Sequence, residues 1–256
     1  MRLKTTTWNI GGGKQLREGE DPSLMVSYSI DAVQDIARWL RRASPDIITL
    51  QEAHGNHDGH SNQVKEIAEL LGYKYSFFHA TSTSHLDPDK TIGNGIISRH
   101  SMSNQIGGVF LNPNLSAEIQ GRFVTSHDKG YVACRVDVNG REVFVATLHM
   151  LPFEPFEIEF GSGIGQAILR SMEDALLPTS PVALIQGDFN INSEQIGSIF
   201  PNLLTKGMSE VSIDRPTTPK GKRLDHVLCR EMALVSIVVD PDVRTDHYPV
   251  TCSFVI

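Results

Sequence analysis

Short apolar runs recur along this chain, bounded by glycine, proline and polar residues. Runs of roughly four to eight apolar residues with such boundaries predict β-strands. We therefore expect strands over residues 3–8, 46–50, 75–79, 95–98, 131–138, 143–149, 182–186, 224–229, 234–239 and 250–255. The runs 131–138 and 143–149 flank Asn139-Gly140, and Asn-Gly between two alternating runs is the strongest local signal for a hairpin.

Other segments repeat their apolar residues at helical spacing. One such pattern begins at Ile30 and ends before Ser44-Pro45, because a residue that precedes proline disfavours the helical conformation. Further helices are expected over residues 64–71 and 164–177, which end at Gly72 and Pro178. Helices and strands alternate at first, whereas the middle of the chain contains hairpin-like pairs. This order predicts an α/β protein with two mixed sheets and helices outside them.

Composition places the chain among ordinary globular proteins. It has 256 residues, of which 40% are apolar and 21% charged, and neither a linker-like stretch nor a repeat divides it. We therefore expect a single domain over residues 1–256. No run approaches the roughly 18 apolar residues of a membrane span, and no apolar signal-peptide core is apparent. Cys134, Cys229 and Cys252 are widely spaced in strand-like runs, which predicts reduced core thiols and a cytoplasmic location.

The net charge of −7 affects which substrates are plausible. Proteins that hold long duplexes through many phosphate contacts usually present a basic face. The acidic balance therefore favours short or single-stranded nucleic acids over an extended duplex. It also fits a cluster of acids that binds a divalent metal.

Gly187-Asp188-Phe189-Asn190 follows the apolar run 181–186. In an extended chain, positions two apart lie on the same face, so Asp188 and Asn190 are presented together. Ligands bind at strand ends in open α/β sheets, and an acid beside an amide suits a hard cation and a phosphate oxygen. A turn is the alternative interpretation, because Asp and Asn favour turns. The segment alone does not decide between them.

Polar groups follow several other apolar runs. The groups that stand at these strand ends are Asn9, Glu52, His149, Asp225 with His226, and Asp246 with His247. Each has an ordinary explanation when taken alone, since a single histidine or acid at a strand end is usually solvated. Their repetition at six strand ends predicts one site built by converging strands.

These strand ends also carry a family resemblance. The motifs, in order along the chain, are Thr-Trp-Asn (7–9), Leu-Gln-Glu (50–52), Gly-Asn-Gly-Ile-Ile-Ser-Arg (93–99), Thr-Leu-His (147–149), Gly-Asp-Phe-Asn (187–190), Leu-Asp-His-Val (224–227) and Thr-Asp-His-Tyr-Pro-Val (245–250). Together they resemble the ordered signature of the DNase I-like endonuclease/exonuclease/phosphatase superfamily. The resemblance implies a four-layer α/β/β/α sandwich and a Mg²⁺-dependent hydrolase of P–O bonds, in which Mn²⁺ can substitute.

The resemblance also implies roles for individual residues. Glu52 and Asp246 are the expected metal ligands, supported by Asn9, because magnesium needs only one or two carboxylates besides water and phosphate. Catalytic roles fall to five residues: Asp188 orients or activates water, Asn190 donates to a phosphate oxygen, His247 backed by Asp225 acts as acid or base, and His149 contacts the phosphate and protonates the leaving group. Whether Asp188 or the His247–Asp225 pair is the general base stays open.

Four further features lie near the expected site. Lys129 reaches a substrate phosphate or is a surface lysine in a turn, and Asn94 faces the site before an inner strand. The segment with His54, His57 and His60 is expected to be a polar loop at the site mouth, with a second metal or an anion site as the alternative. In residues 151–165, Phe153, Phe156 and Phe160 stack a base, cover a lipid or anchor the segment on the core.

The expected function is that of a metal-dependent phosphodiesterase acting as a monomer on a nucleic acid or nucleotide. The alternative is a hydrolase of a small or lipid-linked phosphoester. Trp8 and Gln51 resemble the branch that removes protein adducts from DNA ends, whereas residues 245–250 resemble sphingomyelinase-like members. An inactive, phosphate-binding member is disfavoured, because no expected acid, amide or histidine is replaced. Endo- versus exo-cleavage stays undecided.

Overall fold

Two sheets form the centre of the computed structural model, which describes residues 1–24, 27–119, 122–193 and 195–256. The first has the strand order β15-β16-β1-β4-β6-β5. The bounds of these strands are Ala233–Val239, Val250–Val255, Arg2–Asn9, Ile47–Gly55, Thr91–Ser98 and Tyr75–Thr83. The second has the order β13-β14-β12-β11-β10-β7, with bounds Ser209–Glu210, Asp225–Arg230, Val182–Asp188, Arg141–His149, Gly130–Val138 and Met102–Val109.

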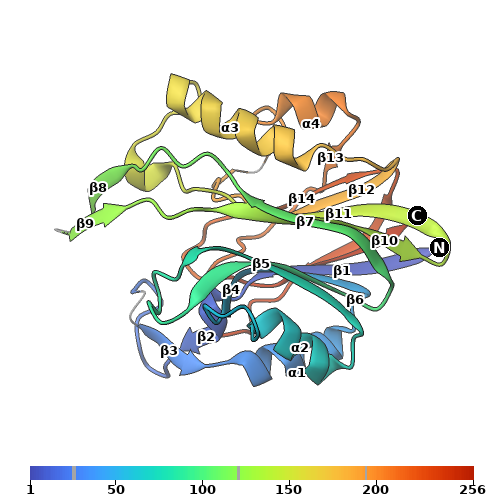
Figure 1. Cartoon of the computed structure of the whole chain (residues 1–256), viewed down its shortest axis with the longest axis horizontal. Coiled ribbons are helices and arrows are strands. Elements are labelled where there is room, and N and C mark those ends of the chain that lie inside the picture. Colours follow the sequence, from blue (N-terminus) through green and yellow to red (C-terminus); the bar gives the residue numbers. More distant parts are fainter. Residues whose placement is uncertain (25–26, 120–121, 194) are drawn as a thin grey trace.

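The helices cover the outer faces of the two sheets (Figure 1). Helices α1 (Val33–Ala43) and α2 (Gln63–Leu71) lie on the first sheet. Helices α3 (Gly163–Leu176) and α4 (Pro201–Thr205) lie on the second. The arrangement confirms the expected four-layer α/β/β/α sandwich. No helix within the described ranges is long and apolar enough to cross a membrane.

Each sheet contains one parallel pair, and these pairs position the chemistry. β1 is parallel to β4, and Asn9 is the register partner of Gln51. β11 is parallel to β12, and His149 is the register partner of Asp188. The other pairings within the two large sheets are antiparallel. Parallel neighbours end at the same sheet edge, so each sheet presents a set of polar strand ends at one end of the sandwich.

Buried polar links tie the two sheets together behind that end. The Gln186 amide on β12 accepts from Thr5 Oγ1 at 3.1 Å and donates to Thr49 Oγ1 at 3.0 Å, both on the first sheet. Gln51 on β4 donates to Thr147 Oγ1 on β11 at 2.7 Å. Buried polar groups are costly unless they are paired. These links therefore favour one relative placement of the sheets, within an otherwise apolar interface of residues such as Val132, Val145 and Leu184.

Several boundaries differ from the sequence prediction. Ile30 does not begin a helix; it lies in β3 (Tyr28–Asp31), which pairs with β2 (Lys14–Leu16). Its exposure of 39% explains the error, because its apolar side chain matched the helical spacing without facing the core. The sequence also missed β7 and the hairpin of β8 (Ser116–Ile119) and β9 (Arg122–Thr125). β7 is largely exposed, so alternating burial is not evident in its sequence.

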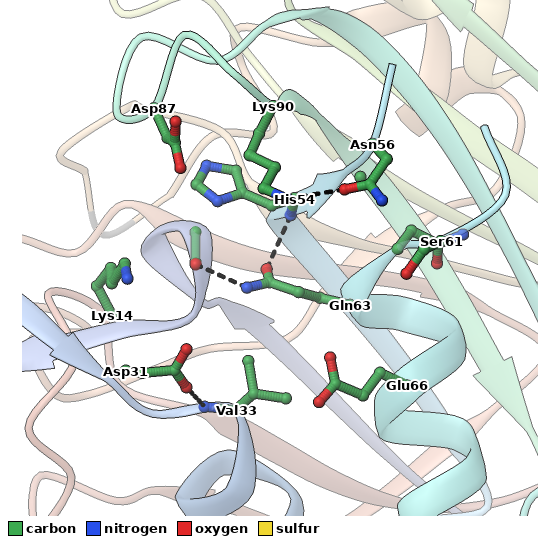
Figure 2. Close-up of a pocket in the computed structure, with 13 residues that line it drawn as sticks. Lys14, Asp31, Val33, His54, Asn56, Ser61, Gln63, Glu66, Asp87 and Lys90 are labelled. Atoms are coloured by element: carbon green, nitrogen blue, oxygen red, sulfur yellow. Dashed lines mark hydrogen bonds between the residues drawn. The ribbon is translucent and has the colours of Figure 1, made fainter. Parts of the chain in front are cut away.

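His54 is not in a loop, in contrast to the prediction. β4 continues through His54 to Gly55, and the imidazole is buried with Nε2 2.8 Å from Ser84 Oγ. Figure 2 shows how Gln63 links this strand to the turn Gly11–Gly13. The Gln63 side-chain amide accepts from the His54 backbone N and donates to the Gly12 carbonyl, each at 2.8 Å. His57 and His60 lie beyond the strand and are exposed. The three histidines therefore do not form one cluster.

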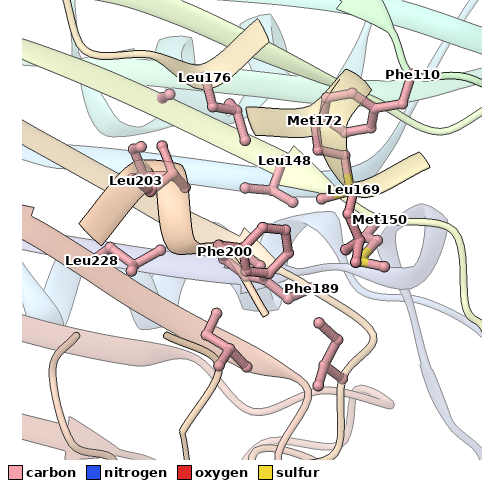
Figure 3. Packing of buried hydrophobic residues seen from close by; sticks show 14 of the residues in the cluster. Phe110, Leu148, Met150, Leu169, Met172, Leu176, Phe189, Phe200, Leu203 and Leu228 are labelled. Atoms are coloured by element: carbon pink, nitrogen blue, oxygen red, sulfur yellow. The ribbon is translucent and has the colours of Figure 1, made fainter. Parts of the chain in front are cut away.

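A second hydrophobic core lies between the second sheet and helices α3 and α4 (Figure 3). Leu169, Met172 and Leu176 on α3 and Phe200 and Leu203 around α4 are buried against this sheet. All three cysteines are buried and carry free thiols, as expected. Burial raises the pKa of the Cys134 and Cys252 thiols to about 12, so both stay protonated.

Candidate active site

Glu52 enters the site through an irregularity in β4. The β4–β6 register shifts between Leu50 and Ala53, and Glu52 has φ 53°. Left-handed backbone is uncommon for a residue with a Cβ. Such a bulge re-aims a side chain, and here it turns a buried carboxylate to the end of the sandwich. No pattern in the sequence predicted this bulge.

The segment Gly187-Asp188-Phe189-Asn190 is a turn and also part of the polar cluster. Asp188 Oδ1 accepts from the Asn190 backbone N at 2.8 Å, and Asn190 has φ 51°. Phe189 is buried, with its ring edge-on to Phe200 at a centroid distance of 5.6 Å. The buried ring anchors the turn, so the two expected interpretations are not exclusive. Asn190 Nδ2 donates to the Met150 carbonyl at 2.8 Å, which leaves one amide hydrogen.

Asp188 is the central carboxylate of the site. Its Oδ2 accepts from Asn9 Nδ2 at 3.0 Å. The same oxygen lies 3.4 Å from His149 Nε2 and 3.6 Å from His247 Nε2. Burial raises the Asp188 pKa to about 6; the positive charge of His247 opposes the rise and the negative charge of Asp225 adds to it. Groups predicted from four separate strand ends therefore meet at one oxygen.

His247 is held by a second buried acid. Its Nδ1 lies 2.8 Å from Asp225 Oδ2, and both side chains are buried. Burial opposes charge on the imidazole, but Asp225 and Asp188 outweigh it and raise the His247 pKa well above its ordinary value. The ring is therefore an imidazolium near neutral pH, with Nε2 directed toward Asp188.

Lys129 belongs to this cluster and is not a free surface lysine. Its side chain is 12% exposed, and Nζ lies 3.2 Å from Glu52 Oε1 and 3.3 Å from His149 Nδ1. Burial opposes the Glu52 charge, but the positive charge of Lys129 outweighs it and lowers the Glu52 pKa below its usual range. Burial and the Lys129 charge lower the His149 pKa well below its ordinary value. His149 is therefore neutral, in contrast to His247.

Asp246 has an unsatisfied oxygen next to these groups. Its Oδ1 is buried and lacks a hydrogen-bond partner among the described residues. Burial and the Glu52 charge raise the Asp246 pKa to about 6, although His247 opposes the rise. The turn Gly11–Gly13 closes around this carboxylate: a Cβ at Gly11 would lie 2.7 Å from Asp246 Oδ1, and Gly11 has φ 51°.

These donors fit a hard divalent cation. Two acids that repel each other, one with an orphaned oxygen, are stabilised by a cation, and magnesium requires few protein ligands. Asn9 Oδ1 already accepts from the Gly11 backbone N at 3.0 Å, so it supports the turn beside Asp246. Over the described part of the chain, no three or more His, Cys, Asp or Glu side chains converge as a metal cage.

Asn94 faces the cluster as expected, and two histidines near it were missed. Asn94 is buried and donates from Nδ2 to the Gly130 carbonyl at 2.8 Å, which fixes the backbone next to Lys129. His85 and His127 stack at a centroid distance of 4.9 Å, and His85 Nε2 lies 3.9 Å from Glu52 Oε1. Both come from connections between strands, where no apolar run marks their position.

Residues 151–165 anchor on the core and border the second sheet. Phe153 is buried in the core cluster and packs on the 36%-exposed Phe160 at a centroid distance of 5.2 Å. Phe156, in the short helix Glu154–Phe156, packs against the same cluster while partly buried. The anchoring role expected for these rings is therefore correct for Phe153.

Comparison with known families agrees with this geometry. The family model described as "Endonuclease/Exonuclease/phosphatase family" matches residues 6–247. This range includes Asn9 and His247, the first and last residues of the polar cluster along the chain. The chain belongs to this family. A comparison with curated protein sequences gave no match.

Solved structures share the fold of the family. An endonuclease/exonuclease/phosphatase from Beutenbergia cavernae is 20% identical with a TM-score of 0.75, covering 99% of this chain and 71% of that one. The 3′ phosphatase NExo from Neisseria, bound to a product DNA hairpin, is 17% identical with a TM-score of 0.63, covering 99% and 100%. TDP2 from D. rerio, complexed with a single-strand DNA product, is 15% identical with a TM-score of 0.62, covering 100% and 99%.

Proposed function

We propose that this chain is a divalent-metal-dependent phosphodiesterase that hydrolyses P–O bonds in a nucleic acid or nucleotide. One observation carries the proposal: Asp188 Oδ2 is shared by Asn9, His149 and His247, with Glu52 and Asp246 beside them. Phosphoester hydrolysis needs a positioned water, neutralisation of the phosphate and a proton for the leaving oxygen. The cluster offers a group for each task.

A bound Mg²⁺ or Mn²⁺ would neutralise phosphate oxygens and the developing charge as a Lewis acid. Glu52 and Asp246 are the proposed ligands, and Asn9 supports them through the turn Gly11–Gly13. The orphaned Asp246 Oδ1 and the repulsion between the two acids are the observations that favour a cation there.

The charge states favour one assignment of the proton transfers that the sequence left open. An imidazolium cannot accept a proton, so His247 is a donor to the phosphate and Asp225 holds it charged. Asp188, with a pKa of about 6, is ionised at neutral pH and is the proposed acceptor of the water proton. When the surroundings push the pKa values of two neighbouring groups apart, one group can act as the acid and the other as the base of the same site.

Three further groups contact Asp188 or its neighbours. His149 bridges Asp188 and Glu52 through its two nitrogens, at 3.4 and 3.6 Å, and as a neutral imidazole is proposed to contact the phosphate, whereas the proton for the leaving oxygen is proposed to come from the His247 imidazolium. Lys129 reaches the same position with its ammonium and is proposed to bind a phosphate oxygen. Asn190 keeps one amide hydrogen for the phosphate after bonding Met150, as described above.

A nucleic acid or nucleotide is the proposed substrate. The family relatives NExo and TDP2 were solved with DNA products, and the net charge of −7 favours a short or single-stranded ligand over a long duplex. We further propose that the chain acts as a monomer, which size-exclusion chromatography with light scattering tests directly.

A metal-dependent activity screen tests the function. Purified protein with Mg²⁺ or Mn²⁺ is expected to cleave bis-p-nitrophenyl phosphate and at least one member of a panel of oligonucleotides, nucleotides and phospholipids. Chelation with EDTA should stop the reaction. Failure on the whole panel would remove the proposal, and cleavage of phospholipid alone would replace the substrate class.

Asp188→Ala is the sharpest variant for this screen. It should lower kcat by about 10² to 10⁴, the usual contribution of a positioned acid or base. Asp174→Ala, on an exposed position of α3, is the matched control and should keep wild-type rates. Circular dichroism checks that both variants fold. An Asp188→Ala variant with near-wild-type kcat would mean that the water-activating group lies elsewhere.

A further inference from the structure

A stacked pair of imidazoles borders the site on the side away from Asp188 and His247. The rings of His85 and His127 lie 4.9 Å apart at 19°. His85 comes from the connection between β5 and β6, and its side chain is 28% exposed. His127 comes from the segment between β9 and β10, two residues before Lys129. Neither has a role in the proposed chemistry at the scissile phosphate.

Both histidines are held by polar contacts of their neighbours. Asn112 Nδ2 donates to Asp128 Oδ1 at 2.8 Å and to the Ser126 carbonyl at 3.2 Å, which fixes the backbone on both sides of His127. Ser84 Oγ accepts from the backbone N of Leu86 and Asp87 at 3.1 and 3.2 Å, which fixes the turn that carries His85. The two histidines therefore lie in connections whose conformation is held by hydrogen bonds.

Hydrogen-bond donors outnumber acids around this pair. Lys129, His85, His127 and His149 line one small hollow whose acids are Glu52 and Asp128. Asp128 accepts a hydrogen bond from Asn112, and Glu52 is the proposed metal ligand, so both acids already have partners. The hollow also contains Ser82, whose buried Oγ has no hydrogen-bond partner in the described part of the structure. A buried hydroxyl without a partner calls for one from outside the protein.

We propose that His85 and His127, next to Lys129, form a subsite for a second, non-scissile phosphate of the substrate, with Ser82 as an additional donor. The stacked rings cover one face of each other, so their N–H edges are the groups left to bind a ligand. Imidazole, ammonium and hydroxyl donors match phosphate oxygens.

This subsite rests on the proposed function and narrows the substrate class. A second phosphate beside the scissile one occurs in an oligonucleotide or in a nucleotide that carries a further phosphate, but not in a simple diester. The enzyme is therefore expected to prefer substrates that carry a second phosphate near the scissile one.

Binding of small nucleotides tests the subsite without requiring turnover. Isothermal titration calorimetry with Mg²⁺ compares thymidine 3′,5′-bisphosphate with thymidine 3′-monophosphate and 5′-monophosphate. The bisphosphate should bind wild-type protein about tenfold more tightly than either monophosphate. Its second phosphate is charged, and hydrogen bonds to a charged group contribute more binding free energy than those between neutral groups. Equal affinities for bisphosphate and monophosphates would overturn the subsite, even if the protein cleaves diesters.

Two double variants separate phosphate binding from ring stacking. His85→Phe with His127→Phe keeps the stacked rings but removes their N–H groups, and should lower the bisphosphate advantage to about twofold. His85→Gln with His127→Gln removes the rings but keeps amide donors, and should retain part of the advantage. His60→Phe, at an exposed position outside the site, should keep all of it. A preserved advantage in the Phe variant with loss in the Gln variant would overturn the proposal.

Discussion

Single residues in this site gain their chemical character from the neighbour that holds them. His149 and His247 both touch Asp188 Oδ2, yet the first has a lowered pKa and the second a raised one. The difference follows from what lies behind each ring: Lys129 behind His149, and Asp225 behind His247. The two imidazoles therefore differ in charge, so we expect His247 and not His149 to donate a proton.

Asp225→Asn should make His247 lose its charge near neutral pH. The neutral amide no longer stabilises the imidazolium, so the His247 pKa should fall toward and below its ordinary value. We expect kcat to fall by about 10²-fold, the lower end of the range for an acid–base group. Long-range ¹H–¹⁵N NMR spectra recorded against pH measure the pKa directly. An unchanged pKa would show that Asp188 alone keeps His247 charged.

Asp246→Asn should stabilise the protein when metal is absent. The pKa of Asp246 in the folded protein, about 6, is higher than the ordinary carboxyl pKa of 3.8, so this group favours folding at low pH and loses that contribution as pH rises through 6. The asparagine has no such loss. In EDTA, the gain in Tm of the variant over wild type should grow from pH 4 to pH 8, followed by thermal denaturation.

Added Mg²⁺ should reverse the order of these two proteins. It raises the Tm of the wild type, because a ligand that binds only the folded state stabilises it. The variant lacks one proposed ligand and should shift less. A Mg²⁺ response of equal size in both proteins would contradict the assignment of Asp246 as a ligand.

At the scale of residues, the sequence predicted the polar groups because each follows an apolar run. Asn9, Glu52, His149, Asp188, Asp225, Asp246 and His247 all lie in the cluster or beside it. His85 and His127 were missed because they stand in connections, where neither periodicity nor a motif marks a position. His54 was misassigned because its glycine- and aspartate-rich surroundings indicate a loop, although β4 continues through it.

At the scale of elements, the site depends on the placement of one sheet against the other. Asn9 and Glu52 come from the first sheet, whereas His149 and Asp188 come from the second. Sequence patterns predict which residues form strands, but they do not give the register between sheets. That register is favoured by buried hydrogen bonds of Gln51 and Gln186, whose side chains carried no recognisable signal beyond the Leu-Gln-Glu motif.

Gln186→Leu should therefore reduce stability and activity together. The substitution leaves the Thr5 and Thr49 hydroxyls without their partner, and an unsatisfied buried polar group costs about 1–3 kcal/mol. Urea denaturation measures the free energy of unfolding. Gln15→Leu is the control, because the Gln15 amide also bonds a neighbour but at an exposed position. A Gln186→Leu variant as stable as this control would mean that packing alone sets the sheet register.

At the scale of the whole molecule, the chain cannot be divided into two consecutive halves. The N-terminal strand β1 pairs with the C-terminal strand β16, from Arg2 opposite Val255 to Thr7 opposite Val250. β1 is also parallel to β4, so the ends of the chain complete a sheet whose other strands come from its first 100 residues and from residues 233–239. We therefore propose that residues 1–256 form one cooperative domain.

This proposal predicts one unfolding transition for two different probes. Trp8 and Trp39 are the only tryptophans, and their fluorescence reports the layer of the first sheet and α1. Far-UV circular dichroism reports both sheets. Because the buried glutamine links and the apolar interface couple the sheets, the two signals should give the same midpoint in urea, as expected for two-state unfolding. Separate midpoints would show that the second sheet with α3 and α4 holds its structure independently, and the active site would then be lost before either half unfolds completely.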